Sequence, residues 1–229
     1  MDNKELKESM QHLQVQTFLS ILQKENAVKP LDNILDLGCG SGEEAAQLAI
    51  LTGADVCGVD INKKFDEKSK ELATLENYDG LHLPFADNTF DAIYSFHVLE
   101  HVKNVHLVLS EAQRVLKQIG IAYFGVPNRE RFLGYIGMRH KSFYQKVRQN
   151  AIDWKYRLSG RFENRYGAHA GFREKELEQM LNKYFAEVRP VSDLYYFAKE
   201  NYFSSIFQFA KKLGVEKKII PSVYVLAIK

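Results

Sequence analysis

The sequence predicts an α/β protein with a doubly wound, mostly parallel sheet that carries helices on both faces. Three observations lead to this prediction. Short apolar segments alternate with longer amphipathic ones along the chain. A glycine-rich turn, GCGSG, directly follows the first apolar segment, and the next apolar segment, DVCGVD, ends in an acidic residue. Regular alternation of strand and helix is typical of parallel sheets, whose ligands lie at the carboxyl ends of the strands.

The first half of the chain gives the clearest pattern. The first residues place apolar side chains at helical spacing. Farther along, Asn62 is expected to cap a helix that runs to about Leu75. The other elements predicted there are, in chain order, an amphipathic helix (2–26, within an N-terminal helical cap of residues 1–30), a buried strand (33–37), a helix rich in alanine and leucine (43–51) and a second strand (55–60).

The second half continues the alternation but is interrupted after Pro127. Residues 128–168 contain no clear strand and are expected to form a helical insertion in the same single domain of residues 1–229. Around this insertion the pattern predicts a strand (91–96), a helix (105–116) stopped by Gly120, a strand (121–126), a helix (173–184), a strand (186–190), an aromatic helix (194–213) and a closing strand (222–228).

Size and composition bound the class of protein. A chain of 229 residues with 45% hydrophobic and 26% charged residues has the profile of one globular domain, and its net charge of +2 does not favour a nucleic-acid partner. No run of 18 apolar residues predicts a transmembrane helix, and the polar N-terminus does not resemble a signal peptide. Only two cysteines, Cys39 and Cys57, are present, so we expect a cytoplasmic protein, either a monomer or a homodimer.

The glycine-rich turn excludes two kinds of phosphate site. Gly38 and Gly40 match the first two glycines of the dinucleotide fingerprint G-x-G-x-x-G, but Glu43 stands where the third is required. An acid at a helix start also opposes a pyrophosphate, which binds the positive end of the helix. A P-loop is excluded because no Gly-Lys-Ser/Thr is present.

Four segments in order resemble the class I S-adenosylmethionine (SAM)-dependent methyltransferases of the small-molecule type, such as those of ubiquinone and menaquinone biosynthesis. They are ILDLGCGSGEEAAQLA, VDIN, YDGLHLPFADNTFDAIYSFHVLEHV and RVLKQIGIAYFGVPN, the last with Gln118-Ile119 where Pro-Gly is usual. The resemblance implies a Rossmann-like, seven-stranded sheet with an antiparallel C-terminal strand and a lid at 128–168. It also implies SAM as cofactor and S-adenosylhomocysteine (SAH) as product.

The same resemblance assigns cofactor-binding residues at the strand ends. Glycine lets backbone approach a ligand closely because no Cβ stands in the way. The acid that ends the second strand is expected to accept both ribose hydroxyls, and the acid of the first strand to lie near the SAM ammonium. The expected set is Asp36, Gly38, Cys39, Gly40, Gly42, Asp60, Ile61, Asp79, Gly80, Leu81, Phe96 and His97.

Two members of that set have an alternative interpretation. Asp79 is expected to accept from the adenine amino group, yet Asp79-Gly80 could be only a turn. Ile61 is expected to pack on the adenine ring, yet it could be a core residue. The stretch from Asp60 to Asp79 is also short for the family, so its third strand is expected to be degenerate.

The segment FHVLEH contains H-x-x-E-H, the spelling of inverted zinc peptidases. Those enzymes need the motif within one helix, whereas here it straddles a strand end and a loop, so we expect no metal. The segment instead resembles the "vLEHv" of small-molecule methyltransferases, which places Glu100 and His101 beside the acceptor as candidate catalytic bases. A structural or capping role for His101 is the alternative, and His82 and His106 are expected at the surface.

The insertion is basic and aromatic, with ten Arg and Lys against three acids between Arg129 and Arg165. It could be a lid for an anionic, aromatic or lipid-like acceptor, a nucleic-acid surface, or a helical hairpin whose aromatics are core. The absence of an Asn/Asp-Pro-Pro-aromatic motif after the fourth strand makes nucleic acid the weaker choice. The aromatic helix around Tyr195–Phe209 could touch a membrane surface, and His169 could line the pocket or be a loop residue.

These observations predict transfer of a methyl group from SAM to a small molecule by in-line displacement, with most of the acceleration coming from proximity. An RNA or protein methyltransferase, and a SAM-binding protein without turnover, stay open as alternatives. An NAD-dependent oxidoreductase is opposed by Glu43.

Overall fold

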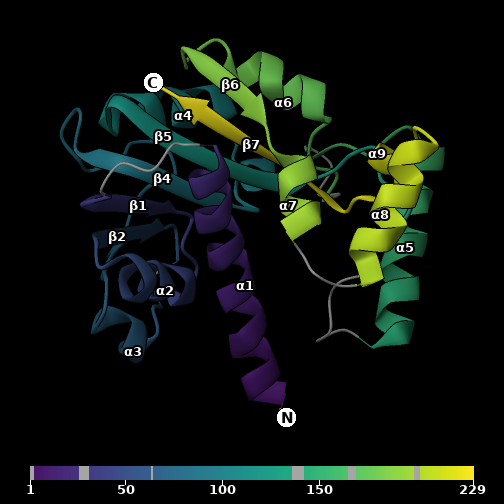
Figure 1. The fold of residues 1–229 in the computed structure, drawn as a ribbon, viewed down its shortest axis with the longest axis horizontal. Coiled ribbons are helices and arrows are strands. Elements are labelled where there is room, and N and C mark those ends of the chain that lie inside the picture. Colours follow the sequence, from purple (N-terminus) through teal and green to yellow (C-terminus); the bar gives the residue numbers. More distant parts are fainter. Residues whose placement is uncertain (1–2, 26–30, 63, 136–141, 165–168, 199–201) are drawn as a thin grey trace.

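The computed structural model describes residues 3–25, 31–62, 64–135, 142–164, 169–198 and 202–229 (Figure 1). Its described residues form one seven-stranded sheet in the order β3-β2-β1-β4-β5-β7-β6. β7 is antiparallel to both β5 and β6, and the remaining pairs are parallel, as predicted. The strands are β1 (Asn33–Leu37), β2 (Asp55–Asp60), β3 (Thr74–Asn77), β4 (Phe90–Phe96), β5 (Leu116–Pro127), β6 (Glu187–Pro190) and β7 (Ser222–Ile228).

Helices cover both faces of the sheet. Neighbouring residues of a strand point to opposite faces: the Tyr123 ring packs against Phe18 of α1, whereas Phe124 packs against Phe185, just after α6. His106 of α4 bonds to Tyr184, which places α4 on the α6 side. The helices are α1 (Asn3–Lys24), α2 (Glu43–Thr52), α3 (Glu67–Lys70), a 3₁₀ turn η1 (Leu99–His101), α4 (Val105–Val115), α5 (Phe143–Leu158), α6 (Glu174–Leu181), α7 (Ser192–Ala198), α8 (Tyr202–Lys212) and α9 (Glu216–Ile219).

The predicted N-terminal helix is confirmed as α1, and it is part of the core. Val15, Phe18 and Ile21 are fully buried. The ring of Phe18 lies 5.3 Å from that of Tyr94 and 5.0 Å from that of Tyr123, so α1 packs directly on the two central strands. Burying three large apolar side chains stabilises the fold by several kcal/mol, on the order of 2 kcal/mol each.

The helix predicted from Asn62 to about Leu75 is wrong. Asp66 caps a single short helix, α3, by accepting from the Ser69 amide, and the chain then forms the edge strand β3. The amide of Asn62 instead donates to Asp60. The error has a physical reason: β3 is four residues long and mostly exposed, so its sequence lacks the apolar alternation that marks a half-buried strand.

Two further boundaries differ from the prediction. α4 ends at Val115, and β5 begins at Leu116 rather than at 121, with Ile119 at φ 61° before Gly120. The aromatic helix predicted at 194–213 is two helices, α7 and α8. Helix propensity alone does not resolve either break, because tertiary packing decides where such a segment turns.

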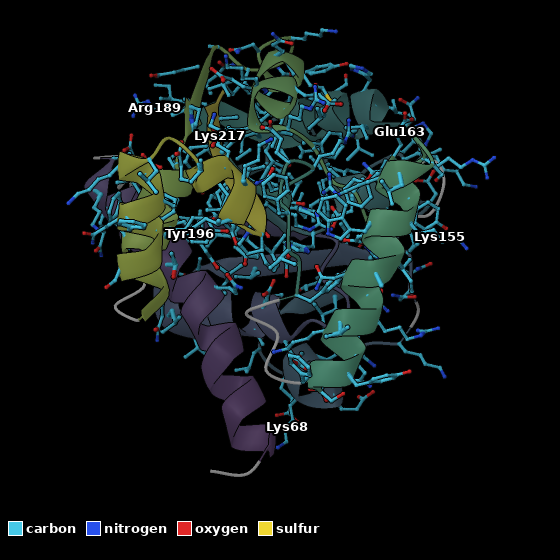
Figure 2. The ribbon with its side chains drawn as sticks, turned by 90° about the vertical axis from the view of Figure 1, so that its right-hand side faces the viewer. Lys68, Lys155, Glu163, Arg189, Tyr196 and Lys217 are labelled. Carbon is cyan, nitrogen blue, oxygen red and sulfur yellow. The ribbon has the colours of Figure 1, made fainter. Side chains whose placement is uncertain are left out.

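The carboxyl ends of the parallel strands face the end of the molecule that carries α5, α8 and α9. β7 runs antiparallel to them, and its arrowhead points away from that end (Figure 1). Figure 2 looks onto it and shows α8 and α5 on opposite sides. None of the helices among the described residues is both long and apolar enough to cross a membrane. The expected cytoplasmic location stays a prediction.

Candidate functional site

The glycine turn after β1 is held against the end of β2. The amides of Gly38 and Cys39 both donate to the carbonyl of Val59, at 2.8 and 3.1 Å. Gly38 has φ 83°, and a Cβ placed on it would lie 2.2 Å from Cγ2 of Val98, so only glycine fits there. Gly40 also has a positive φ, 57°, but a Cβ there would meet nothing within 4 Å. The turn therefore packs on protein at Gly38 and has open space beside Gly40.

Asp60 lies where the sequence predicts it, beside that turn. Its Oδ2 accepts a hydrogen bond from the Gly40 amide at 2.9 Å, and its Oδ1 accepts from the Asn62 amide at 2.8 Å. The residue is 9% exposed, so the carboxylate is largely withdrawn from solvent. Each carboxylate oxygen has a second lone pair, which leaves acceptor capacity for a ligand hydroxyl.

A second buried carboxyl lies behind the turn. Asp36 is 2% exposed, and its Oδ2 has no hydrogen-bond partner among the described residues. Burial, reinforced by the nearby charges of Glu44 and Asp60, raises its pKa well above the ordinary range. Burial likewise raises the pKa of Glu44 to about 7. Three acids thus converge at the turn, and a cationic ligand bound there would favour their ionised forms.

The predicted adenine side is formed by the ends of β2 and β3. Ile61 is 67% exposed, so it is not a core residue, and it stands over Gly80. Asp79 holds its own turn: it accepts from the amides of Leu81 and His82, both at 2.7 Å, and pairs with Nδ1 of His82 at 2.8 Å. These hydrogen bonds lower the pKa of Asp79 to about 2. The turn interpretation of Asp79 thus has direct support, and adenine contact stays a prediction.

Phe96 and His97 end β4, as expected. His97 has φ 57°, a conformation that is uncommon outside glycine. Its amide donates to the Gly125 carbonyl at 2.7 Å, and its Nε2 bonds to Oγ of Ser222 at 3.0 Å. Burial and the charge of Arg131 lower the pKa of His97 to about 3. These contacts fix the imidazole, whose Nδ1 lies 3.7 Å from Oε1 of Glu100.

Glu100 and His101 lie together on η1, but their surroundings differ. Glu100 is 6% exposed, and neither carboxylate oxygen makes a hydrogen bond within the described part of the chain. Burial raises its pKa to about 7. His101 is exposed, and its Nε2 lies 3.9 Å from Oε1 of Glu100.

His169 completes this group, which the sequence did not predict. Its ring centroid lies 4.7 Å from that of His101, almost perpendicular to it. Ligand atoms of Glu100, His101 and His169 all lie within 4.8 Å of one another. The histidine of GAHAGF was a signal in the sequence, but 68 positions separate it from His101, and only the fold brings the two together. We call Glu100, His101 and His169 the acceptor-side cluster.

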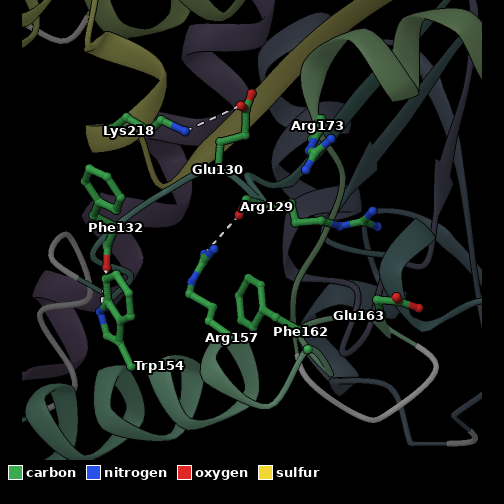
Figure 3. Close-up of a pocket in the computed structure, with 10 residues that line it drawn as sticks. Arg129, Glu130, Phe132, Trp154, Arg157, Phe162, Glu163, Arg173 and Lys218 are labelled. Carbon is green, nitrogen blue, oxygen red and sulfur yellow. Dashed lines mark hydrogen bonds and ion pairs between the residues drawn. The ribbon is translucent and has the colours of Figure 1, made fainter.

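A separate cavity of about 440 Å³ lies within the insertion (Figure 3). Its cations have protein partners: Arg129 pairs with Glu176 at 2.9 Å, and Lys218 with Glu130 at 3.6 Å. The guanidinium of Arg157 lies 3.8 Å over the Phe162 ring. None of the predicted cofactor residues lines this cavity, whose walls are Arg129, Glu130, Phe132, Trp154, Arg157, Gly160, Phe162, Glu163, Arg173 and Lys218.

A hydrogen bond from a buried ion pair of the insertion reaches the acceptor-side cluster. Arg131, 4% exposed, donates to Oδ2 of Asp153 in α5 at 3.0 Å and to the carbonyl of His169 at 2.8 Å. The insertion therefore packs directly beside the acceptor-side cluster. Some of its aromatics are buried, such as Phe162, whereas Phe143 is 83% exposed, so a purely core role does not describe them all.

Comparison with known proteins agrees with this geometry. Residues 35–124 match the family described as "Methyltransferase domain". A sterol 24-C-methyltransferase of Gibberella zeae is 38% identical over 109 residues, which are 43% of this chain and 28% of that protein. A demethylmenaquinone methyltransferase of Symbiobacterium thermophilum is 37% identical over 105 residues, 40% of this chain and 41% of that protein. The chain thus spans less than half the length of these curated relatives.

Solved structures extend the likeness to the whole fold. The plantazolicin methyltransferase BpumL, in complex with a monoazolic desmethylPZN analog and SAH, superposes with a TM-score of 0.67 over 99% of this chain and 86% of that one, at 16% identity. A phosphoethanolamine N-methyltransferase of Haemonchus contortus gives a TM-score of 0.58 over 93% of this chain and 52% of that one, at 20% identity. Residues 35–124 are therefore similar to a methyltransferase domain, and the solved structures share the fold of nearly the whole chain.

Proposed function

We propose that this protein transfers a methyl group from SAM to a small-molecule acceptor. The observation that carries the proposal is the pairing of the Gly40 amide with Asp60, beside a buried oxygen of Asp36 that has no hydrogen-bond partner among the described residues. This arrangement offers acceptors for hydroxyl groups, open space beside Gly40 and carboxyl groups that a cationic ligand would ionise. SAM has two ribose hydroxyls and two cationic groups, so its chemistry fits the residues present.

Different residues of the chain are proposed to bind different parts of the cofactor. Asp60 accepts the ribose hydroxyls, the backbone of Gly38, Gly40 and Gly42 with Cys39 borders the amino-acid portion, and Asp36 offsets its positive charge. Ile61 and the backbone of Gly80 and Leu81 cover the adenine, with Phe96 and His97 closing the side toward the acceptor. SAM supplies a methyl group on a sulfonium, which is already a good leaving group, so positioning the acceptor provides most of the acceleration.

Glu100 and His101 are the proposed catalytic residues, because they project from the end of β4 toward the acceptor side. Glu100 is buried without a hydrogen bond in the described structure, which is costly unless a ligand satisfies it. For an acceptor that carries a hydroxyl, these two side chains hold it and govern the loss of its proton.

The insertion suggests which chemical class of acceptor the protein methylates. We assign residues 128–168 as a lid that selects an anionic, aromatic or lipid-like small molecule, since Arg131 of this segment donates to the His169 carbonyl and lies 5.5 Å from the centre of the Phe162 ring. Relatives named for sterol, menaquinone and rifamycin methylation support a small molecule rather than RNA or protein. The aromatic α8, with Lys211 and Lys212 in its last turn, is a proposed contact with a membrane surface.

The test has a binding arm and a turnover arm. Calorimetry should show that SAH binds the full chain, whereas NAD should neither bind nor raise the melting temperature; the opposite result rejects the assignment. Turnover with radiolabelled SAM and a panel of phenolic, quinol and sterol acceptors then separates an enzyme from a SAM-binding protein without activity. Binding of SAH with no transfer to any small molecule, or transfer only to RNA or protein, would overturn the acceptor class.

A further inference from the structure

We propose that the acceptor-side cluster of Glu100, His101 and His169 is a binding site for a divalent transition-metal ion. The inference that this ion holds an oxygen acceptor rests on the proposed function; the metal site itself does not. The expectation of no metal was based on His97 and His101 lying on a strand end and a loop. The structure supplies a third ligand, His169, from a different part of the chain.

The geometry of the three side chains fits one small cation. One ligand atom from each lies within 4.8 Å of the others, with Nε2 of His101 3.9 Å from Oε1 of Glu100. Ligands bound about 2.0–2.2 Å from a common zinc-like ion stand roughly 3–4 Å apart, so only a small adjustment brings the three onto one centre. The exposed rings of His101 and His169 also leave the site open to an incoming ligand.

Glu100 gives an independent reason to expect a ligand. Only 6% of its surface is exposed, and both of its carboxylate oxygens lack a hydrogen-bond donor in the described structure. A buried carboxyl without a partner costs free energy that a native fold ordinarily recovers by pairing, hydrogen bonding or metal coordination. Its oxygens face His97 and His101, neither within hydrogen-bond distance. A cation between Glu100 and the imidazoles would satisfy it.

Hydrogen bonds of the surrounding backbone hold the segment that carries His169. Its carbonyl accepts from Arg131, and two residues later the Gly171 amide donates to Oδ1 of Asn164 at 2.8 Å. Gly171 has φ 71°, and a Cβ on it would lie 1.8 Å from the Pro127 carbonyl oxygen, so this segment presses against the end of β5. Ligands positioned in advance by their surroundings bind metal more tightly.

The donor set indicates the kind of metal. Two imidazoles and one carboxylate favour zinc, cobalt, iron or manganese over magnesium or calcium, which prefer all-oxygen sites. Three protein ligands leave at least one position for a ligand from solution, as in catalytic zinc sites. His97 lies beside the cluster. Its Nε2 bonds to Oγ of Ser222, and its Nδ1 lies 3.7 Å from Oε1 of Glu100, where it can form a hydrogen bond to that metal-binding carboxylate.

This site implies an acceptor that presents an oxygen, such as a phenol, a catechol or an enolic hydroxyl. The hydroxyl loses its proton to solvent water, because coordination lowers its pKa. One lone pair of that oxygen forms the new C–O bond while the C–S bond breaks and its electron pair stays on sulfur, giving a methyl ether and SAH. No oxidation or reduction occurs. Glu100 and His101 then act through the ion instead of taking the proton themselves.

The experiment measures metal binding without any turnover. The full chain, expressed without a histidine tag and dialysed against EDTA, is titrated with CoCl₂ by visible absorption and with ZnCl₂ by calorimetry. We expect one equivalent to bind the native chain, with d–d bands typical of imidazole and carboxylate ligands. His169→Ala should bind at least tenfold more weakly, whereas the matched control His106→Ala, which removes an exposed histidine bonded to Tyr184, should bind like the native chain.

The outcomes separate the two proposals. Absence of a stoichiometric site in the native chain, or equal affinity in His169→Ala and the native chain, overturns the metal site even if SAH binds. Circular dichroism and melting temperature of each variant exclude unfolding as the cause of lost binding, and Glu100→Gln provides a second variant of nearly unchanged shape. Metal binding in a chain that fails to bind SAH would leave the metal site standing and remove the proposed function.

Discussion

The Gly40 amide donates a 2.9 Å hydrogen bond to Oδ2 of Asp60, which joins the turn after β1 to the end of β2. The bond fixes both halves of the candidate cofactor site relative to each other. It also means that Asp60 has a structural partner in the free protein, so a variant at this position changes the turn as well as the ligand contacts.

We expect Asp60→Ala to lower SAH affinity at least tenfold, because the ribose hydroxyls lose their acceptor and the Gly40 amide loses its anchor. Two lost hydrogen bonds to a charged group should cost about 1.5–3 kcal/mol each at most, which a domain of this size can absorb. Calorimetry measures the affinity. Asp55→Ala, at the exposed start of the same strand, is the control; equal affinities in the two variants would remove Asp60 from the site.

Gly38→Ala should destabilise the protein by roughly 3 kcal/mol, since the new Cβ would overlap the Val98 side chain at a positive φ. Gly53→Ala, which also has a positive φ but open space, should cost only about 1 kcal/mol. Urea denaturation measures both free energies of unfolding. Adding Val98→Ala to Gly38→Ala should recover part of the loss, and a failure to do so would show that backbone strain alone is responsible.

The stability of the native chain relative to Glu44→Gln should fall as the pH rises from about 4.5 to 7. Burial raises the pKa of Glu44 from 4.5 to about 7 in the folded state, so the folded chain keeps a proton that the unfolded chain releases. The stabilisation is complete below pH 4.5 and lost as the pH passes 7. Since one pKa unit is ~1.4 kcal/mol, the change should approach ~3 kcal/mol. Parallel stability curves for the two proteins from pH 4.5 to 8 would contradict this.

Arg131→Met should destabilise the protein by about 3–5 kcal/mol, because it leaves the carboxylate of Asp153 buried without its ion-pair partner. The double variant Arg131→Met, Asp153→Leu should be more stable than the single variant, since no buried charge is left unpaired. Chemical denaturation measures both. A double variant that is no more stable than Arg131→Met would mean that the other hydrogen bonds of Arg131, to Asn128 and His169, dominate.

The sequence predicted where the proposed cofactor residues lie relative to the strands, because that arrangement depends on local features. Gly38, Gly40 and Asp60 lie at strand ends, and a strand followed by a glycine turn can be predicted from a short stretch of sequence. The antiparallel β7 followed from the family resemblance and is confirmed. The third strand was expected to be degenerate but was not located, since the four mostly exposed residues of β3 carry no periodic apolar signal.

The acceptor half was less predictable because its contacts are long-range. Nothing in the spacing of His97, Glu100 and His101 indicates that His169 joins them. Nor does it indicate that the Glu100 carboxylate is buried without a hydrogen bond from any residue that the structure describes. Nor does a basic, aromatic composition reveal that Arg131 is buried against Asp153 rather than exposed to a ligand. Such facts depend on how the insertion returns to the sheet.

The insertion returns to the sheet at a β-bridge between Asn128 and Phe172, where the Phe172 amide donates to the Pro127 carbonyl and Gly171 packs closely on the same carbonyl. Apart from Arg131, Asp153 and His169, residues between these two points can change while both ends stay anchored to β5. If the insertion selects the acceptor as proposed, substitutions within it would change the acceptor of related chains. His169 would keep its position, because the neighbouring Gly171 and Phe172 contact the end of β5.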